Sequence, residues 1–383
     1  MPVTTGMIGY VVTGHRESRY VLADKKYTPP TFQMIDPDWM SALYDNAVMK
    51  GPANPFERPS MVVLDGVDHR KLRQYVARYF TPANARAIRD DITEIVDDTL
   101  VGLGVMREVD LVSDYCKVIP AKVSAKILGM SDAEARMLAT LGDESVKMLE
   151  IGRPFKEFSQ VERCIERLDT WIDEQFRLIL RGRRKPAGLV GILAKDLGKP
   201  QPPLTRREAK ALLSLLVLAG FETTVNLIGS GIQLLTQHPE QLRILKSEPQ
   251  HWPNAIDEIL RIDGPVLGTV RKANEDDWIG DVRVPRGTFI LVSGANHDPS
   301  VFPAPYTFDI KRINAKDHIT FGGGRHFCTG AHLARVEGEI ALSRLFKRFP
   351  NLSPSAECTR RTSTFLRGWQ SMPMRLNDSD AME

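Results

Sequence analysis

Apolar residues recur at helical spacing over most of the chain, and shorter alternating runs occupy two smaller regions. The middle of the chain predicts four successive amphipathic helices, at residues 83–104, 111–128, 132–149 and 158–183. Another helix is predicted from Asp68 to about Phe80, just before a proline. Residues 188–203 are rich in glycine and proline, which is typical of a connector.

The strand-like stretches lie near the start of the chain and in its last third. Residues 1–35 mix short apolar runs, such as 10–12 and 20–22, with glycine and proline, and predict short strands and turns. Residues 278–293 alternate well enough to predict strands separated by glycine-containing turns. The chain is therefore expected to be mostly α-helical with a smaller β-rich part.

One predicted helix is apolar on nearly every face. Residues 205–208, Thr-Arg-Arg-Glu, have the pattern of a capping box, and the apolar run continues until His238 and Pro239 end it. About 33 residues at ~1.5 Å each give a length of roughly 50 Å. A helix that is apolar on all sides is buried, so we expect it to cross the interior of the protein.

Four residues interrupt the apolar character of this long helix, Gly220, Glu222, Thr223 and Thr224. A helical glycine costs ~1 kcal/mol relative to alanine, and a buried carboxylate costs more unless it is paired or protonated. Such local departures mark functional sites. The alternative is a glutamate that reaches solvent through a groove, with threonines that bond to backbone carbonyls.

A glycine-rich stretch delivers one cysteine to the start of a predicted helix. Residues 321–330 read Phe-Gly-Gly-Gly-Arg-His-Phe-Cys-Thr-Gly, and apolar residues then recur at helical spacing until Pro350. Cys328 therefore precedes the first turn of this helix. Free N–H groups and the positive end of the helix dipole there favour a thiolate over a thiol.

Four kinds of site compete for this cysteine. A nucleophile needs a base, and His326 is only two residues away. A zinc site needs several Cys, His or carboxylate ligands, whereas this segment offers one cysteine and one histidine. A phosphate loop is a weaker reading, because no Gly-Lys-Ser/Thr follows. A haem iron needs one thiolate and backbone close to a flat macrocycle, so the glycines favour haem.

The segment 321–330 matches Phe-Gly-x-Gly-x-His-x-Cys-x-Gly and resembles the haem-binding loop of the cytochrome P450 superfamily, the haem-thiolate monooxygenases. The similarity continues through His-Leu-Ala-Arg at 332–335. The resemblance implies a cytochrome P450 fold, with haem b between the long helix and the cysteine loop. It also implies that residues 1–383 form one domain and that Cys328 is the axial iron ligand.

Other parts of the chain resemble further family motifs. Residues 219–224 resemble the acid–alcohol motif, which gives Glu222 and Thr223 catalytic roles in proton delivery on the side of the iron opposite the cysteine. Glu258 and Arg261 resemble the structural ExxR pair. Residues 295–299 read Ala-Asn-His-Asp-Pro, where the family has arginine in place of His297.

The resemblance also implies a set of binding residues. His69 and Arg73 share one helical face and resemble the pair that binds a haem propionate, for which a guanidinium is well suited. The predicted cofactor contacts are His69, Arg73, Ala219, Arg271, Phe321, Gly322, His326 and Gly330. The predicted wall of the substrate chamber is Leu215, Leu218, Ala219, Val266, Leu267 and Leu366. These apolar side chains imply a lipophilic compound such as a terpenoid, steroid, fatty acid or polyketide.

Composition narrows the remaining possibilities. The 51 basic and 48 acidic residues leave a net charge of +3, which argues against general nucleic-acid affinity. Four widely spaced cysteines without a CxxC pair argue against a disulfide framework or zinc cluster. The apolar segment 211–221 is shorter than the ~20 residues of a membrane span, and the N-terminus lacks the pattern of a signal peptide. We expect a cytoplasmic protein without a membrane anchor.

The resemblance implies a reaction with O2 and a lipophilic small molecule, in which one oxygen atom enters a C–H bond. Electrons would come from a ferredoxin or flavodoxin with its NAD(P)H reductase. Docking is expected at basic residues on one surface, Arg70, Lys71, Arg78 and Arg325. The same scaffold could instead catalyse oxidative coupling, desaturation or a peroxide-driven reaction. A haem sensor or carrier is a different class, which has no need for an acid and an alcohol beside the iron.

Overall fold

The computed structural model describes residues 9–30, 52–54, 57–145, 155–363 and 365–376. Its α-helices are α1 (His15–Ala23), α3 (Gly66–Ala77), α4 (Pro82–Ala87), α5 (Arg89–Leu103), α6 (Val118–Leu128), α7 (Asp132–Ser145), α8 (Phe155–Leu180), α9 (Gly188–Leu197), α10 (Arg206–Gln237), α11 (Pro239–Ser247), α12 (Trp252–Asp263) and α13 (Ala331–Arg348). Its strands are β1 (Tyr10–Val12), β2 (Tyr27–Thr28), β3 (Glu108–Asp110), β4 (Gly268–Ala273), β5 (Asp277–Ile279), β6 (Val282–Val284), β7 (Phe289–Ser293), β8 (Ser353–Pro354), β9 (Thr359–Arg360), β10 (Trp369–Ser371) and β11 (Pro373–Arg375).

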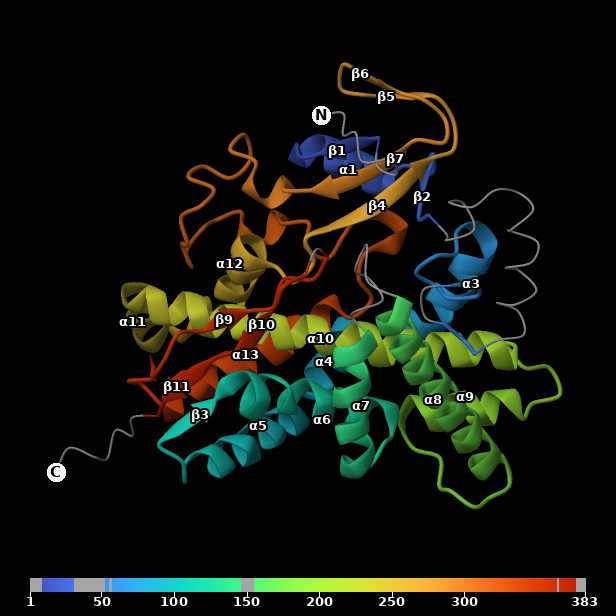
Figure 1. Ribbon diagram of the computed structural model, residues 1–383, viewed down its shortest axis with the longest axis horizontal. Helices are drawn as coiled ribbons and strands as arrows, with labels where there is room; N and C mark the ends of the chain where they lie inside the picture. The colour runs from blue at the N-terminus through green and yellow to red at the C-terminus, as the bar shows by residue number, and fades with distance from the viewer. Residues whose placement is uncertain (1–8, 31–51, 55–56, 146–154, 364, 377–383) are drawn as a thin grey trace.

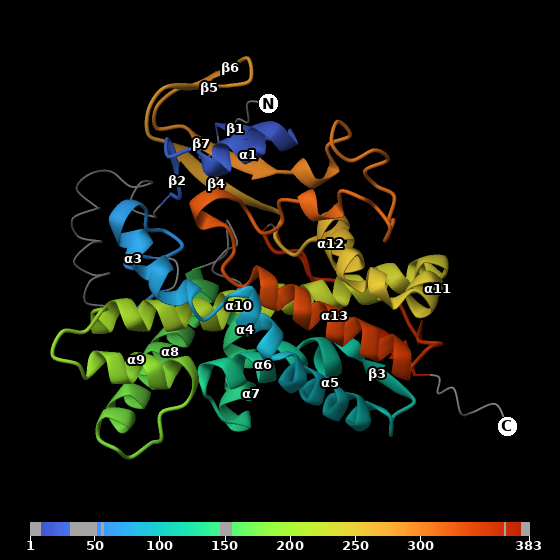
Figure 2. The same ribbon diagram turned by 180° about the vertical axis from the view of Figure 1, so that it is seen from behind.

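The largest sheet and the helices α5 to α9 lie on opposite sides of the long helix α10. Figure 1 shows the sheet and α1 above α10 and α5 to α9 below it, and Figure 2 shows the same arrangement from behind. The sheet has the order β1-β7-β4-β2, in which β1 and β7 are parallel and the other neighbours are antiparallel. Smaller sheets pair β3, β11 and β8, β5 with β6, and β10 with β9.

Helix α10 is the centre of the structure. It begins at the predicted capping box, in which Thr205 accepts from the backbone N–H of Glu208 and the Glu208 side chain accepts from that of Thr205. Its 32 residues contact α6 to α9 as well as α12 and α13. By length and composition α10 is apolar enough to cross a membrane, but 78% of its most apolar window is buried inside the protein, as expected for a core helix.

Several predicted elements differ from the observed ones. Residues 20–22 belong to α1 rather than to a strand, because Ser18, Val21 and Leu22 lie on one buried helical face. The predicted helix 83–104 is interrupted at Ile88, which separates α4 from α5. Residues 112–116 form a π-helical turn before α6. The part of the predicted helix 132–149 after Ser145 lies outside the described residues.

The segment predicted to be a connector contains the helix α9. Its apolar residues Leu189, Val190 and Leu193 are spaced for one helical face and are buried. The helical spacing of these residues was therefore a better guide to the structure than the glycine and proline content of the segment. The glycine that begins α9 has another purpose. Gly188 has φ +51°, and a Cβ there would lie 2.3 Å from the backbone nitrogen of Gly129, the left-handed residue that ends α6. These two glycines let the helix ends meet.

The predicted ExxR pair lies wholly inside the protein and ties α12 to the loop that leads towards the cysteine. Arg261 Nε lies 2.7 Å from Glu258 Oε2, and Arg312 Nε contacts Glu258 Oε1 at 3.0 Å. Arg261 also donates to the carbonyl oxygens of Asn296 and Pro305. A guanidinium can serve all of these acceptors at once because its donors form a planar fork.

Candidate functional site

The glycine-rich loop before α13 is shaped by backbone conformations that other residues rarely adopt. Gly322 has φ +72° and Gly324 has φ +59°. A Cβ on Gly324 would lie 2.4 Å from the carbonyl oxygen of Leu22, so the loop packs directly against α1. The N–H of Cys328 donates to the Phe321 carbonyl at 2.9 Å and closes the loop. The cysteine is thereby fixed three residues before α13, as the sequence predicted.

The side chain of Cys328 is exposed, in contrast to the mostly buried helix α10. The protein around the sulfur still displaces bulk water, and this desolvation raises the pKa of the thiol. A backbone hydrogen bond from Gly330 and the charges of Arg73 and Arg335 act in the opposite direction but do not offset it. The hydrogen bond from Gly330 is the contribution expected of the helix start, and desolvation of the sulfur opposes it. A metal ion binds the deprotonated form and would supply the missing stabilisation.

The long helix has a gap in its buried surface. Ala219 and Gly220 are exposed and Thr223 is half-buried, whereas Leu218 and Phe221 are buried. These three positions lie on one side of α10 because residues 219 and 223 are one turn apart. The hydroxyl of Thr223 donates to the Ala219 carbonyl at 2.9 Å, and that of Thr224 to the Gly220 carbonyl at 3.0 Å. Thr223 therefore borders an accessible space, and Thr224 does not.

Glu222 lies on another side of α10 and is only 1% exposed. Its Oε1 lies 2.7 Å from Nη1 of Arg361, which follows strand β9. The glutamate therefore does not reach solvent through a groove by itself, and Arg361, with 18% of its side chain exposed, is the more accessible partner. Sequence reasoning missed Arg361, because no local pattern links it to α10.

Two histidines and two arginines form a cationic cluster near the cysteine loop. The rings of His69 and His326 are 4.3 Å apart, and His69 Nδ1 and His326 Nε2 are buried without hydrogen-bond partners in the described residues. Arg73 donates to the Thr329 hydroxyl, and Arg271 donates to the Thr269 hydroxyl. Neither arginine pairs with a carboxylate within the described ranges.

The electrostatics of this cluster are those of an anion site. Burial lowers the pKa of His326 to about 3 and that of Arg271 to about 10, and it also lowers the pKa values of His69 and Arg73. Positive groups are thus held in a buried position without their own counter-charge. This arrangement and the unpaired ring nitrogens fit the carboxylates of a haem whose iron is bound by Cys328.

The predicted chamber residues fall into two groups. Val266 forms a β-bridge with Leu366, and the N–H of Leu267 donates to the Phe365 carbonyl at 3.1 Å, so these segments lie side by side. Leu215 and Leu218 are each 6% exposed and belong to the apolar cluster that α10 forms with α8 and α9. The structure brings the first group together at one place and leaves the second group mostly in the core.

The basic residues expected to bind a redox partner are largely paired within the protein. Lys71 contacts Glu208 at 2.8 Å, and Arg78 stacks over Tyr75. Arg325 forms a two-bond pair with Asp65, with Nε 2.6 Å from Oδ1, and also donates to the Tyr27 carbonyl. Arg70 is exposed, and no ion pair involves it in the described part of the chain. Of the four, Arg70 is the best placed to meet a partner.

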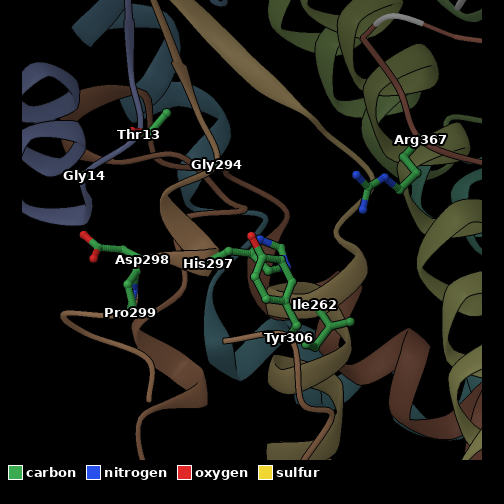
Figure 3. Close-up of a pocket in the computed structure, with 9 residues that line it drawn as sticks. All are labelled: Thr13, Gly14, Ile262, Gly294, His297, Asp298, Pro299, Tyr306 and Arg367. Carbon is green, nitrogen blue, oxygen red and sulfur yellow. The ribbon is translucent and has the colours of Figure 1, made fainter. Parts of the chain in front are cut away.

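A separate pocket of about 650 Å³ lies between the start of α1, the end of α12 and the loop after β7 (Figure 3). The ring of His297 stacks on that of Tyr306, with centroids 5.1 Å apart. Burial lowers the pKa of His297, and the charges of Arg261 and Arg367 add to the effect. None of the predicted catalytic or binding residues lines this pocket. A stacked, uncharged ring thus occupies the position where the related motif has arginine.

The structure also contains a buried acid that sequence reasoning missed. Glu337 in α13 is 3% exposed, and its Oε1 has no hydrogen-bond partner among the described residues. Burial raises the pKa of its carboxyl to about 8. The signal in the sequence was a glutamate within the apolar face of the helix that follows the cysteine.

Comparisons with known proteins agree with this geometry. A family model described as Cytochrome P450 matches residues 151–368. A putative cytochrome P450 140 of Mycobacterium tuberculosis is 35% identical over 339 residues, covering 86% of this chain and 76% of that protein. The 6-deoxyerythronolide B hydroxylase of Saccharopolyspora erythraea is 32% identical over 386 residues, covering 97% of this chain and 91% of that protein.

Solved structures share the whole fold. The structure of P450BioI in complex with an acyl carrier protein ligated to hexadec-9Z-enoic acid has a TM-score of 0.87 and 27% identity, covering 98% of this chain and 94% of that chain. That of the myxobacterial cytochrome P450 CYP267B1 in complex with myristic acid has a TM-score of 0.85 and 27% identity, covering 98% and 92%. The predicted fold class is confirmed, and the chain belongs to the cytochrome P450 family, as an oxidoreductase of the monooxygenase type.

Proposed function

We propose that this enzyme inserts one oxygen atom from O2 into a C–H bond of a lipophilic small molecule. The observation that carries the proposal is the exposed Cys328 on its glycine loop, together with the gap in the buried surface of α10 beside Thr223. A single cysteine ligand and a distal hydroxyl are what an oxygen-activating haem site requires from the protein. A sensor or carrier would not need the hydroxyl or the neighbouring carboxylate.

The residues present fit haem b. Cys328 would be the axial ligand, and His69, Arg73, Arg271 and His326 would bind the propionates. Phe321, Gly322, Gly330 and Ala219 would contact the macrocycle. When bound, haem supplies one-electron and O2 chemistry at its iron, and a thiolate ligand donates electron density that favours O–O cleavage. The remaining tasks, which are binding, orientation and proton supply, belong to the side chains of this chain.

Thr223 and Glu222 would supply protons. A threonine hydroxyl is both a donor and an acceptor, so that of Thr223 can leave the Ala219 carbonyl and hold a water molecule in the accessible space. Glu222 is the nearest carboxylate along α10 and can pass a proton to that water. The positions of these two groups would direct protons to one place and so limit the diversion of electrons and O2 into hydrogen peroxide.

The substrate would be apolar. Two segments that meet in the structure contribute the apolar side chains of Val266, Leu267 and Leu366. The backbones of these segments are already hydrogen-bonded to each other. The names of similar proteins include a vitamin D(3) hydroxylase and complexes with fatty acids or a fatty-acyl carrier protein. Large lipophilic compounds, including fatty acyl chains, steroids, terpenoids and polyketides, are therefore the first class to test. Electrons would come from a ferredoxin or flavodoxin with its NAD(P)H reductase.

The experiment has two arms. In the first, the carbon monoxide spectrum of the reduced protein should show the strongly red-shifted band of a thiolate-bound haem, and Cys328→Ser should abolish it while Cys116→Ser leaves it unchanged. In the second, compounds that shift the iron from low to high spin are incubated with a ferredoxin, its reductase and NADPH. Product that carries one atom from labelled O2 supports the proposal. A normal spectrum without any product from spin-shifting compounds would favour the sensor or carrier.

A further inference from the structure

The buried polar residues of α10 form a stripe that faces the C-terminal segment. Glu222, Asn226 and Ser230 are spaced four residues apart and are each buried. Glu222 pairs with Arg361 at 2.7 Å, and Ser230 donates to Asp263 at 2.6 Å. Ala219 lies one turn before this stripe, at i−3 from Glu222 and i−7 from Asn226, so the exposed part of α10 and the buried polar residues adjoin along the helix.

The C-terminal segment is held firmly against this stripe. Arg360 and Arg367 both contact Asp263, at 2.8 and 2.9 Å, and so share the carboxylate that Ser230 binds. A Cβ on Gly368 would lie 2.3 Å from Asn226 Oδ1, so only glycine allows this approach. The N–H of Arg361 donates to the Gly368 carbonyl at 3.0 Å. The backbone that carries Arg361 is therefore fixed relative to α10.

An ionised carboxylate inside a protein must be paired, or it takes up a proton or moves towards water. The pair with Arg361 meets this need for Glu222 at one defined position, directly before Thr223 in the chain. Because 18% of the Arg361 side chain is exposed and Glu222 is almost fully buried, water reaches the pair from the arginine side.

We infer that Arg361 is a positioning residue for proton delivery, because it holds the Glu222 carboxylate next to Thr223 and orders the water that reaches it. The inference rests on the proposed function, in which Glu222 and Thr223 supply protons. Each proton that Glu222 accepts from water on the Arg361 side leaves on the Thr223 side. The carboxylate is thereby regenerated and pairs with the guanidinium again.

Other ionisable groups on elements packed against α10 do not replace this cation. Asp263 at the end of α12 is already bound by two arginines. Glu337 on α13 is an acid whose pKa is raised to about 8, and Tyr115 and Cys116 in the π-helical turn have pKa values raised by burial. Lys117 lies at the junction of that turn with α6 and makes its own interactions. Arg361 is the guanidinium in direct contact with Glu222.

The first test uses the haem-loaded enzyme and compares Arg361→Met, Arg361→Lys and Arg360→Gln. Arg360 is a matched control because it is the neighbouring arginine of the same segment but pairs with Asp263. Arg361→Met should keep the carbon monoxide spectrum and the substrate-induced spin shift, while coupled product formation falls about tenfold. This is less than the ~10²–10⁴-fold that a general acid–base group contributes, because Glu222 itself remains. Its activity should also need a higher pH, because an unpaired buried carboxyl holds its proton more tightly. Arg361→Lys should recover most of the activity, and Arg360→Gln should leave both the coupling and the pH profile unchanged.

The second test does not depend on activity. The midpoint of thermal unfolding is measured for Arg361→Met, Glu222→Gln and the double variant at about pH 5 and about pH 8. Arg361→Met should lose more stability at the higher pH. There an unpaired Glu222 must either carry a buried negative charge or hold a proton that the unfolded chain would release, and either one lowers the free energy of unfolding. Glu222→Gln in the same chain should restore the midpoint, which is the coupling expected of a contacting pair.

Two results would overturn the inference. One is an unchanged coupling and pH profile in Arg361→Met, and the other is an equal loss in Arg361→Met and Arg360→Gln, which would show that the segment has only a structural role. Failure of the proposed function is distinguishable, because a wild-type enzyme without product in any redox system would still show the stability coupling. Product formation with hydrogen peroxide in place of the reductase should survive in Arg361→Met, since peroxide brings its own protons.

Discussion

Glu337 offers the sharpest test of the electrostatics inside this enzyme. It is a buried residue of α13, the helix that packs against both α5 and α10. Burial raises the pKa of the carboxyl from 4.5 to about 8. At about 1.4 kcal/mol for each pH unit, this corresponds to a difference in unfolding free energy of about 5 kcal/mol between acid and alkaline conditions.

The sign follows from proton linkage. The folded protein holds the proton more tightly than the unfolded chain, so its stability is fully present below about pH 4.5 and is lost as the pH rises towards about 8. At pH 7 the loss is about 3 kcal/mol relative to acid conditions. Glu337→Gln removes the ionisable group and keeps its shape. The variant should therefore be more stable than the wild type at neutral pH, and the difference should shrink as the pH approaches 5.

The measurement is the midpoint of thermal unfolding, followed by circular dichroism from about pH 5 to about pH 8.5. For a chain of 383 residues, about 3 kcal/mol corresponds to about 4 °C. Glu339→Gln is the matched control, because Glu339 is on the same helix but is partly exposed and pairs with Arg89 at 2.7 Å. If Glu337→Gln leaves the pH dependence unchanged, or if Glu339→Gln abolishes it, the assignment of the buried proton to Glu337 is wrong.

Three further predictions concern the frame, the distal hydroxyl and the docking surface. Arg261→Lys should lower stability by about 3 kcal/mol or more and loosen haem retention, because the three donors of a lysine cannot replace the five hydrogen bonds that Arg261 makes to Glu258 and three loop carbonyls. The exposed Arg283→Lys is the control, and an equal loss in both would contradict the structural role. Thr223→Ala should keep haem and substrate binding while raising the hydrogen peroxide yield several-fold. Thr224→Ala, whose hydroxyl bonds the Gly220 carbonyl, should not, and the reverse pattern would show that the wrong face of α10 was assigned. Arg70→Glu should slow reduction by a ferredoxin more than Arg78→Glu does. The difference between the two variants should become smaller as salt is added, since exposed charges are screened beyond ~10 Å at 0.1 M. A reduction rate that changes neither with salt nor with Arg70→Glu would exclude this surface.

The parts of the fold that the sequence predicted well are those with strong local signals. The capping box placed the start of α10, and the glycine-rich loop placed Cys328 before α13. Weak local signals gave the errors. The glycines and prolines of residues 188–203 indicated a connector, although Gly188 allows the start of α9 to approach the end of α6, which only the tertiary structure shows.

The features of the candidate site can also be divided into those with strong local signals in the sequence and those without. His69, His326, Arg73 and Arg271 were identified through motifs. They suit an anion because the two arginines form no ion pair in the described ranges, the histidines have unpaired ring nitrogens, and the nearby Asp65 is already paired with Arg325. The helix start lowers the pKa of Cys328, as predicted, but the sequence did not show the opposing desolvation, because its size depends on the surrounding packing. The local sequence shows whether each contribution raises or lowers the pKa of the cysteine, but it does not show which contribution is larger.

The contact between Arg361 and Glu222 could not be predicted from the sequence of α10 alone, but it could be predicted from α10 and the C-terminal segment together. The polar residues of α10 at 222, 226 and 230 recur every four residues, and an apolar helix with one polar stripe must meet a polar partner in the interior. The C-terminal segment carries Arg360, Arg361 and Arg367 within eight residues. Charge complementarity between the one acid of the buried polar stripe, Glu222, and this basic segment is the sequence signal for the contact. The pair is then a consequence of burial: once Glu222 is inside the protein, some cation must accompany it, and that cation influences whatever the carboxylate does.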